Sequence, residues 1–184
     1  MNHPRRVALL PVVILAAACT QVDDRLERSR AIVGEFQREL GGELRAAMAD
    51  GGPVNAIAVC SDRAPAIAER ASADSGARVS RTALRVRNPD NAPDEAAAAV
   101  LREFEDRLAA GAELPMEQVD RHAGGSMRYM RAIVLEPLCA TCHGTTLAPE
   151  VARAVAARYP ADRATGFEVG EVRGAFLIDW PSGQ

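Results

Sequence analysis

Apolar residues recur at three- and four-residue steps after the amino-terminal segment, a pattern typical of an amphipathic helix. We expect this helix over residues 23–49, with the Gly51-Gly52 pair marking its end. A second helical region follows over residues 53–72, where prolines stand at positions that suit the starts of helical segments. This part of the chain therefore predicts a long helix and then a shorter one.

The rest of the chain mixes alternating runs with helical periodicity and turn-forming residues. We expect strands over residues 78–87, 116–122, 126–135 and 172–180, and helices over residues 93–111 and 149–158. The two middle strands flank Ala123-Gly124-Gly125, which favours a β-hairpin. Strands in a run, with helices before and between them, are typical of an α+β fold whose antiparallel sheet is covered on one side.

The amino terminus has the pattern of an export signal. A basic pair, Arg5 and Arg6, precedes an apolar stretch over residues 7–18. A mature transmembrane helix needs about 20 apolar residues, so this stretch is too short to span a bilayer. We therefore interpret residues 1–18 as a secretory signal peptide and residues 25–181 as a single domain with a long N-terminal helix.

The signal segment ends in Ala16-Ala17-Ala18-Cys19, which permits two interpretations. One is an ordinary cleavage site after small residues. The other resembles a bacterial lipoprotein box, in which Cys19 is lipidated and residues 19–24 form a tether, although Ala16 stands where the box usually has leucine. An unpaired exported thiol would be a liability, which favours the anchor. We expect a periplasmic protein held at a membrane surface.

Composition narrows the classes of partner. The formal net charge is −3 at pH 7, which gives no reason to expect a nucleic-acid partner. Aromatic residues make up only 4% of the chain. Any apolar binding surface of this protein must therefore be built mostly from aliphatic side chains.

The most restrictive chemical signal is the Cys-Ala-Thr-Cys-His run at residues 139–143, which has the spacing of a c-type haem attachment site. The thiols of Cys139 and Cys142 can add to two vinyl groups on one edge of a porphyrin, and His143 can then bind the iron as proximal ligand. Gly144 lets the backbone turn away without a side chain against the ring.

Two other interpretations of the motif carry less weight. Half of a zinc site would need a second Cys/His pair at ligand spacing, which the sequence does not contain. A dithiol redox pair would be expected between a strand and a helix in an alternating β/α pattern, which is also missing. The sequence therefore favours haem.

A low-spin haem of this type needs a second axial ligand, and the sequence offers few. The candidates are Cys60, His122, Met48, Met116, Met127 and Met130. Methionines on expected apolar faces fill cores more often than they bind metals. His122 stands beside the expected hairpin turn, among charged residues. Cys60 ends an apolar helical segment, and its spacing alone leaves it either a ligand or a buried core thiol.

Several motifs in one order resemble the Tll0287-like c-type haem domain family, found in exported bacterial proteins and in membrane signalling receptors. The matching stretches are residues 54–60, 64–67, 81–89, 93–94, 129–133, 139–144, 164–167 and 170–176. The resemblance extends over about residues 25–180 and implies a PAS-like fold, a helix-flanked antiparallel sheet. It also implies one covalent haem c per chain, with His143 and Cys60 as the axial ligands.

A cluster of arginines in the expected strand over residues 78–87 suits the haem propionates. Guanidinium groups bind carboxylates bidentately, which makes Arg81, Arg85 and Arg87 candidate partners. Residues two apart on a strand share a face, so the three side chains would lie together. The competing interpretation is a solvated strand face.

With both axial positions filled by protein, the iron has no open site for substrate, which argues against a peroxidase or an oxygenase. The leading hypothesis is a redox- or gas-responsive sensor, in which loss of the Cys60 bond shifts its helix. A periplasmic electron carrier and a haem enzyme with a displaceable ligand are the alternatives. We expect a separate redox or signalling partner in the cell envelope.

Overall fold

A long bent helix forms the amino-terminal part of the structure. The computed structural model describes residues 16–182, with side chains described from residue 24 onward, so residues 1–15 of the expected signal peptide lie outside the described residues. Helix α1 (Ala16–Ala58) is kinked at Gly52, whose φ of 69° and ψ of −167° are not helical. Glycine adopts positive φ without steric cost, and Pro53 has no N–H for the broken helix to satisfy. The break predicted at this glycine pair is confirmed.

The second predicted helical region continues α1 through a short irregular joint. After Ala58 the chain forms a π-helix, η1 (Val59–Arg63), and then helix α2 (Ala64–Ser75). Helix α2 ends at Gly76, whose φ of 75° is left-handed and whose N–H donates to the Ser72 carbonyl. Cys60 therefore lies in the joint between two α-helices and not inside either one.

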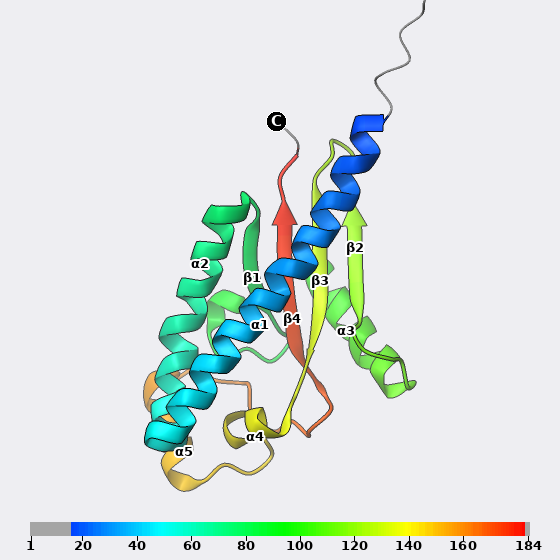
Figure 1. Cartoon of the computed structure of the whole chain (residues 1–184). Helices are drawn as coiled ribbons and strands as arrows, with labels where there is room; N and C mark the ends of the chain where they lie inside the picture. The colour runs from blue at the N-terminus through cyan, green and yellow to red at the C-terminus, as the bar shows by residue number, and fades with distance from the viewer. Residues whose placement is uncertain (1–15, 183–184) are drawn as a thin grey trace, which may run out of the picture.

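The sheet has four antiparallel strands in the order β1-β4-β3-β2: β1 (Arg78–Thr82), β2 (Glu117–Arg121), β3 (Met127–Val134) and β4 (Val172–Trp180) (Figure 1). Strands β2 and β3 form the predicted hairpin, and β4 has the predicted bounds. The first strand was predicted to reach residue 87 and stops at Thr82, which pairs with Ala175. The arginines beyond it bind loop carbonyls and a carboxylate instead of continuing along β4.

Helices cover both faces of the sheet. Helices α1 and α2 cover one face, and α3 (Glu95–Ala109) covers the other (Figure 1). The α1/α2 side buries Val33, Phe36, Ile67, Val79, Tyr129, Phe176, Ile178 and Trp180, and the α3 side buries Leu101, Phe104, Met116, Met130, Ala175 and Leu177. The expectation of a sheet covered on one side is therefore wrong, because β4 is apolar in both alternating sets. The predicted α+β, PAS-like class of helix-flanked antiparallel sheet is confirmed.

Contacts at the end of β4 fix the N-terminal half of α1 on the sheet. The Trp180 indole Nε1–H donates to the Ser29 hydroxyl at 2.8 Å, and Ser29 is fully buried. The Arg28 guanidinium lies over the same indole, 4.5 Å from the ring centre. From this fixed half, α1 crosses the sheet, and its C-terminal end lies beyond the edge formed by β1 (Figure 1).

Two short helices meet α1 at that end of the molecule. Helix α4 (Pro137–His143) contains the haem motif, and α5 (Pro149–Arg158) follows it; a 3₁₀ turn, η2 (Pro89–Asn91), lies after β1. Both α4 and α5 contact α1 (Figure 1). The fold thus brings the joint with Cys60 and the haem motif to one end of the sheet. Within residues 16–182, no helix has an apolar stretch long enough to cross a membrane.

Candidate haem site

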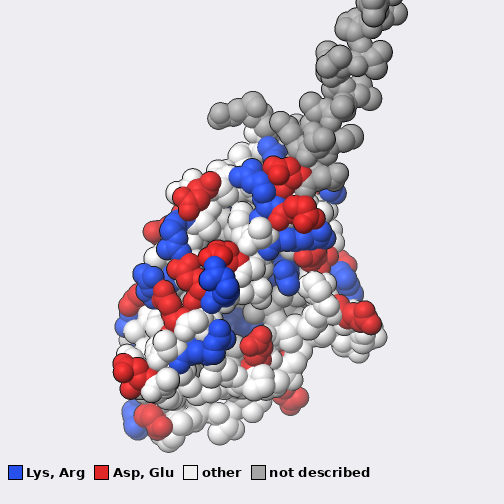
Figure 2. Space-filling view, viewed as in Figure 1, with Lys and Arg blue, Asp and Glu red and all other residues white. Residues whose placement is uncertain are grey.

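The three reactive residues of the motif share one face of a short helix. Cys139, Cys142 and His143 lie in α4, and side chains three and four positions apart on a helix are neighbours. All three are partly buried. The cysteines are free thiols, and burial raises the pKa of each. Figure 2 shows that this end of the molecule is largely uncharged and is hollowed beside α1, with basic atoms recessed in the hollow.

A hydrogen bond fixes the tautomer of the motif histidine. His143 Nδ1 lies 2.7 Å from the Ala164 carbonyl oxygen and 3.1 Å from Arg173 Nε. The carbonyl oxygen only accepts and the guanidinium only donates, so Nδ1 can satisfy one of the two. The carbonyl contact is the shorter, which favours the tautomer with the hydrogen on Nδ1. The lone pair of this imidazole is therefore on Nε2, the atom available to a metal.

The same surroundings keep the imidazole neutral. Burial, with the charges of Arg173 and Arg87 adding to it, lowers the pKa of His143 to about 2. A neutral imidazole is the form that binds metals, so His143 needs no proton loss to become a ligand. Both the tautomer and the charge suit a proximal ligand.

Cys60 faces this site from the π-helical joint. Burial raises the pKa of its thiol; Arg81, Arg87 and Arg173 act in the opposite direction, and Cys139 adds to the rise. These couplings place Cys60 in the same electrostatic environment as the motif. Within residues 24–182 there is no cluster of three or more His, Cys, Asp or Glu side chains that could hold a bare metal ion.

The other candidate ligands lie elsewhere among the described residues. His122 is exposed at the hairpin turn. Met116 and Met130 are buried under α3, and Met127 is buried on the opposite face of the sheet. Met48 is partly buried on α1. The positions of Met116, Met127 and Met130 agree with the expectation that methionines fill the core.

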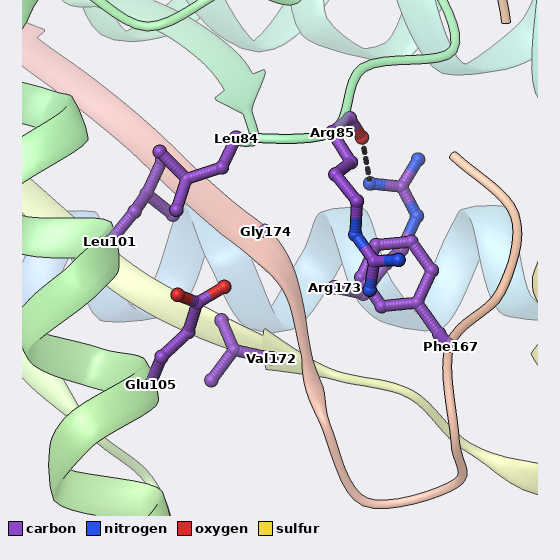
Figure 3. Close-up of a pocket in the computed structure, with 8 residues that line it drawn as sticks. All are labelled: Leu84, Arg85, Leu101, Glu105, Phe167, Val172, Arg173 and Gly174. Atoms are coloured by element: carbon purple, nitrogen blue, oxygen red, sulfur yellow. Dashed lines mark hydrogen bonds between the residues drawn. The ribbon is translucent and has the colours of Figure 1, made fainter. Parts of the chain in front are cut away.

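The predicted arginines do not share one face, because β1 ends before two of them. Arg81 lies on β1 with its guanidinium 5.5 Å from the centre of the Phe36 ring. Arg87 is buried and binds Asp162, with Nε 3.0 Å from the carboxylate. Arg85 turns to the α3 side, where its guanidinium stacks 3.5 Å from the Phe167 ring centre (Figure 3). The prediction of a shared face is therefore wrong for Arg85.

Arg173 is a site residue that the sequence reasoning missed. It lies in β4, where Ile133 pairs with Gly174 and Val134 with Val172, so Arg173 is the extra residue of a β-bulge. Bulges interrupt strand alternation and redirect side chains. The Arg173 guanidinium reaches the His143 ring and donates from Nη1 to the Arg85 carbonyl oxygen (Figure 3). The available signal was a charged residue next to the long apolar run of β4.

The loop after α5 holds α4 in place. The Phe167 N–H donates to the His143 carbonyl at 3.0 Å, and the Gly166 N–H donates to the Gly144 carbonyl at 2.9 Å. From the other side, Arg87 Nη2 donates to the Cys142 carbonyl at 2.6 Å. These bonds use the carbonyl groups that a helix leaves free at its carboxyl end.

The fold itself requires a glycine after the histidine. A Cβ at position 144 would lie 2.5 Å from the Ala140 carbonyl oxygen. Gly144 has φ −69°, so the requirement concerns space and not a left-handed backbone. Without a side chain, residue 144 can lie against the Ala140 carbonyl, and its own carbonyl can accept from the Gly166 N–H in the loop that orients His143.

Comparison with known proteins identifies the family. Residues 13–181 match the Tll0287-like family model, so the chain belongs to this family. Among solved structures, the chain is similar to the cyanobacterial haem protein Tll0287, with 25% sequence identity and a TM-score of 0.67. That match covers 88% of this chain and 97% of the cyanobacterial chain. No curated protein matched the sequence.

Replacing Gly144 tests the packing beneath α4. We expect Gly144→Ala to lower the free energy of unfolding by about 1–3 kcal/mol, because the methyl group meets backbone that cannot rotate away. The matched control is Gly34→Ala in α1, where no atom lies within 4 Å and alanine should stabilise the helix by up to about 1 kcal/mol. Urea unfolding of both variants measures the difference; equal effects would contradict the account.

Proposed function

We propose that this chain is a c-type haem protein, with haem bound covalently through Cys139 and Cys142 and with His143 and Cys60 as axial ligands. The orientation of His143 is the observation that carries the proposal, because its Nδ1–H is fixed on a carbonyl and Nε2 keeps the lone pair. Family membership supports it, as does similarity to a solved haem protein.

The surroundings of the motif fit this cofactor. Apolar side chains pack around both cysteines: Leu135 and Phe167 near Cys139, and Ile57 and Val151 near Cys142. Three arginines also converge on the site, and they suit a ring that carries two carboxylates. Apolar side chains with cations beside them match the chemistry of an amphiphilic, anionic porphyrin.

The position of Cys60 supports a sensing role. When bound, the haem supplies an iron that changes by one electron between the ferric and ferrous states. Cys60 lies in the five-residue π-helix η1, between the kink at Gly52 and helix α2, and π-helical turns are frequent at functional sites. Release of Cys60 would free this joint to rearrange, and a separate partner in the cell envelope would detect the change.

The proposal includes export and anchoring. Cleavage before Cys19 and lipidation of that residue would hold the domain at a membrane surface in the periplasm. The backbone of residues 16–24 belongs to α1, which continues into the domain without a break until Gly52. An anchor at residue 19 would therefore connect through one helix to the folded domain.

The four cysteines can be separated by experiment. In cells that supply c-type haem maturation, we expect the double variant Cys139→Ala/Cys142→Ala to lose all haem that survives denaturing electrophoresis. Cys19→Ala should keep covalent haem and lose labelling by a fatty-acid analogue. Pyridine haemochrome spectra quantify the haem. Covalent haem in the double variant, or none in the wild type, would contradict the proposal.

Carbon monoxide distinguishes a sensor from an electron carrier. A thiolate donates charge to iron and stabilises the ferric state, so we expect the Cys60 bond to weaken on reduction. The ferrous protein should then bind carbon monoxide, with a shift of its Soret band, whereas the ferric protein should not respond. A ferrous spectrum unchanged by the gas would contradict sensing and indicate an electron-transfer cytochrome.

A further inference from the structure

The candidate site contains more positive charge than the protein balances. Arg81, Arg87 and Arg173 are all close enough to act electrostatically on both Cys60 and His143. Within residues 24–182, one carboxylate lies within 4.0 Å of any of these guanidinium groups, and it belongs to Asp162. Partly buried cations without counter-ions are unfavourable, so the surplus calls for an anionic ligand.

One of the three arginines is already paired with a carboxylate of the protein. Arg87 binds Asp162 through Nε at 3.0 Å and Nη2 at 3.3 Å, and Nη2 also donates to the carbonyls of Cys142 and Ala164. Both partners of the ion pair have side chains that are only 10% exposed. Arg87 therefore connects the loop to α4 and has little capacity left for a ligand.

The other two arginines have open donors. Among the described residues, no hydrogen-bond acceptor or carboxylate binds the Arg81 guanidinium, which lies 5.5 Å from the centre of the Phe36 ring in a cation–π contact. Arg173 donates from Nη1 to the Arg85 carbonyl at 3.1 Å. The His143 Nδ1–H already donates to the Ala164 carbonyl, so the 3.1 Å approach of Arg173 Nε to Nδ1 leaves the Arg173 Nε–H without an acceptor. Both side chains come from neighbouring strands, β1 and β4.

We propose that Arg81 and Arg173 bind the two propionate carboxylates of the haem, while Arg87 is structural and Arg85 lies outside the site. This inference rests on the proposed function. The sequence predicted that Arg81, Arg85 and Arg87 would bind the propionates from one strand face. The structure favours Arg81 from β1 together with Arg173 from the β4 bulge. Each guanidinium offers paired N–H groups that match the geometry of a carboxylate.

Resonance Raman spectroscopy of the matured full-length protein tests the pair. The propionate bending mode moves to lower frequency when a propionate loses hydrogen-bond donors. We expect Arg81→Gln and Arg173→Gln each to lower this mode and to shift the reduction potential downward, since positive charge near the iron is lost. Arg85→Gln removes a guanidinium that stacks on Phe167 and bonds to the carbonyls of residues 165 and 166, and it should leave the propionate mode unchanged. The control for both readouts is Arg107→Gln on α3, which removes a guanidinium paired with Glu103 and should change neither the mode nor the potential.

Lysine variants separate charge from geometry. Arg81→Lys and Arg173→Lys keep the charge and lose the paired donors, so the bending mode should fall while the potential stays near that of the wild type. A mode that moves in Arg85→Gln, and not in the variants of Arg81 and Arg173, would overturn the assignment even though haem is bound. Absence of covalent haem in the wild type would instead overturn the proposed function and this inference together.

Discussion

The hydrogen bond from His143 Nδ1 to the Ala164 carbonyl is the contact on which the site depends. It places the imidazole hydrogen away from the metal-binding nitrogen, and that arrangement exists only if Ala164 is held at the right position. The loop containing Ala164 is held by Asp162, whose carboxylate accepts from the Ala164 N–H and binds Arg87. Arg87 in turn bonds to the last turn of α4. Helix, loop and arginine thus form a closed set of contacts around one imidazole.

The second half of the site depends on the length and kink of α1. The Trp180–Ser29 contact fixes the helix on the sheet at one end, and the Gly52 kink redirects the chain at the other. Cys60 follows in a π-helical joint whose Asp62 carboxylate binds Arg158 at the end of α5. The two proposed ligands differ in how firmly the protein holds them. Cys60 lies in a short π-helix between two α-helices, whereas His143 lies on a helix held by hydrogen bonds from the loop and from Arg87. In our account His143 is the fixed ligand and Cys60 the one that can move.

Local patterns were sufficient to predict most elements and the attachment motif. Helical periodicity and the glycine pair located α1 and its break, and alternation with turn residues located the hairpin and β4. Features that depend on contacts between distant segments were missed. Strand β1 ends early because the arginines after Thr82 bind groups more than 50 positions away. Arg173 belongs to the site because a bulge breaks the alternation on which sequence reasoning relies. The need for Gly144 is also spatial, since only the folded chain brings Ala140 O so close.

The ligand pair is the central claim, and electron paramagnetic resonance of the matured ferric protein tests it most directly. The measurement compares the wild type with Cys60→Ala at matched haem content. We expect a low-spin signal of thiolate type in the wild type that is lost in the variant, because haem attachment would use Cys139 and Cys142 and leave Cys60 as the one remaining thiol among the described residues. An identical signal in both proteins would show that Cys60 is only a packed thiol, and the proposed His143/Cys60 pair would be wrong.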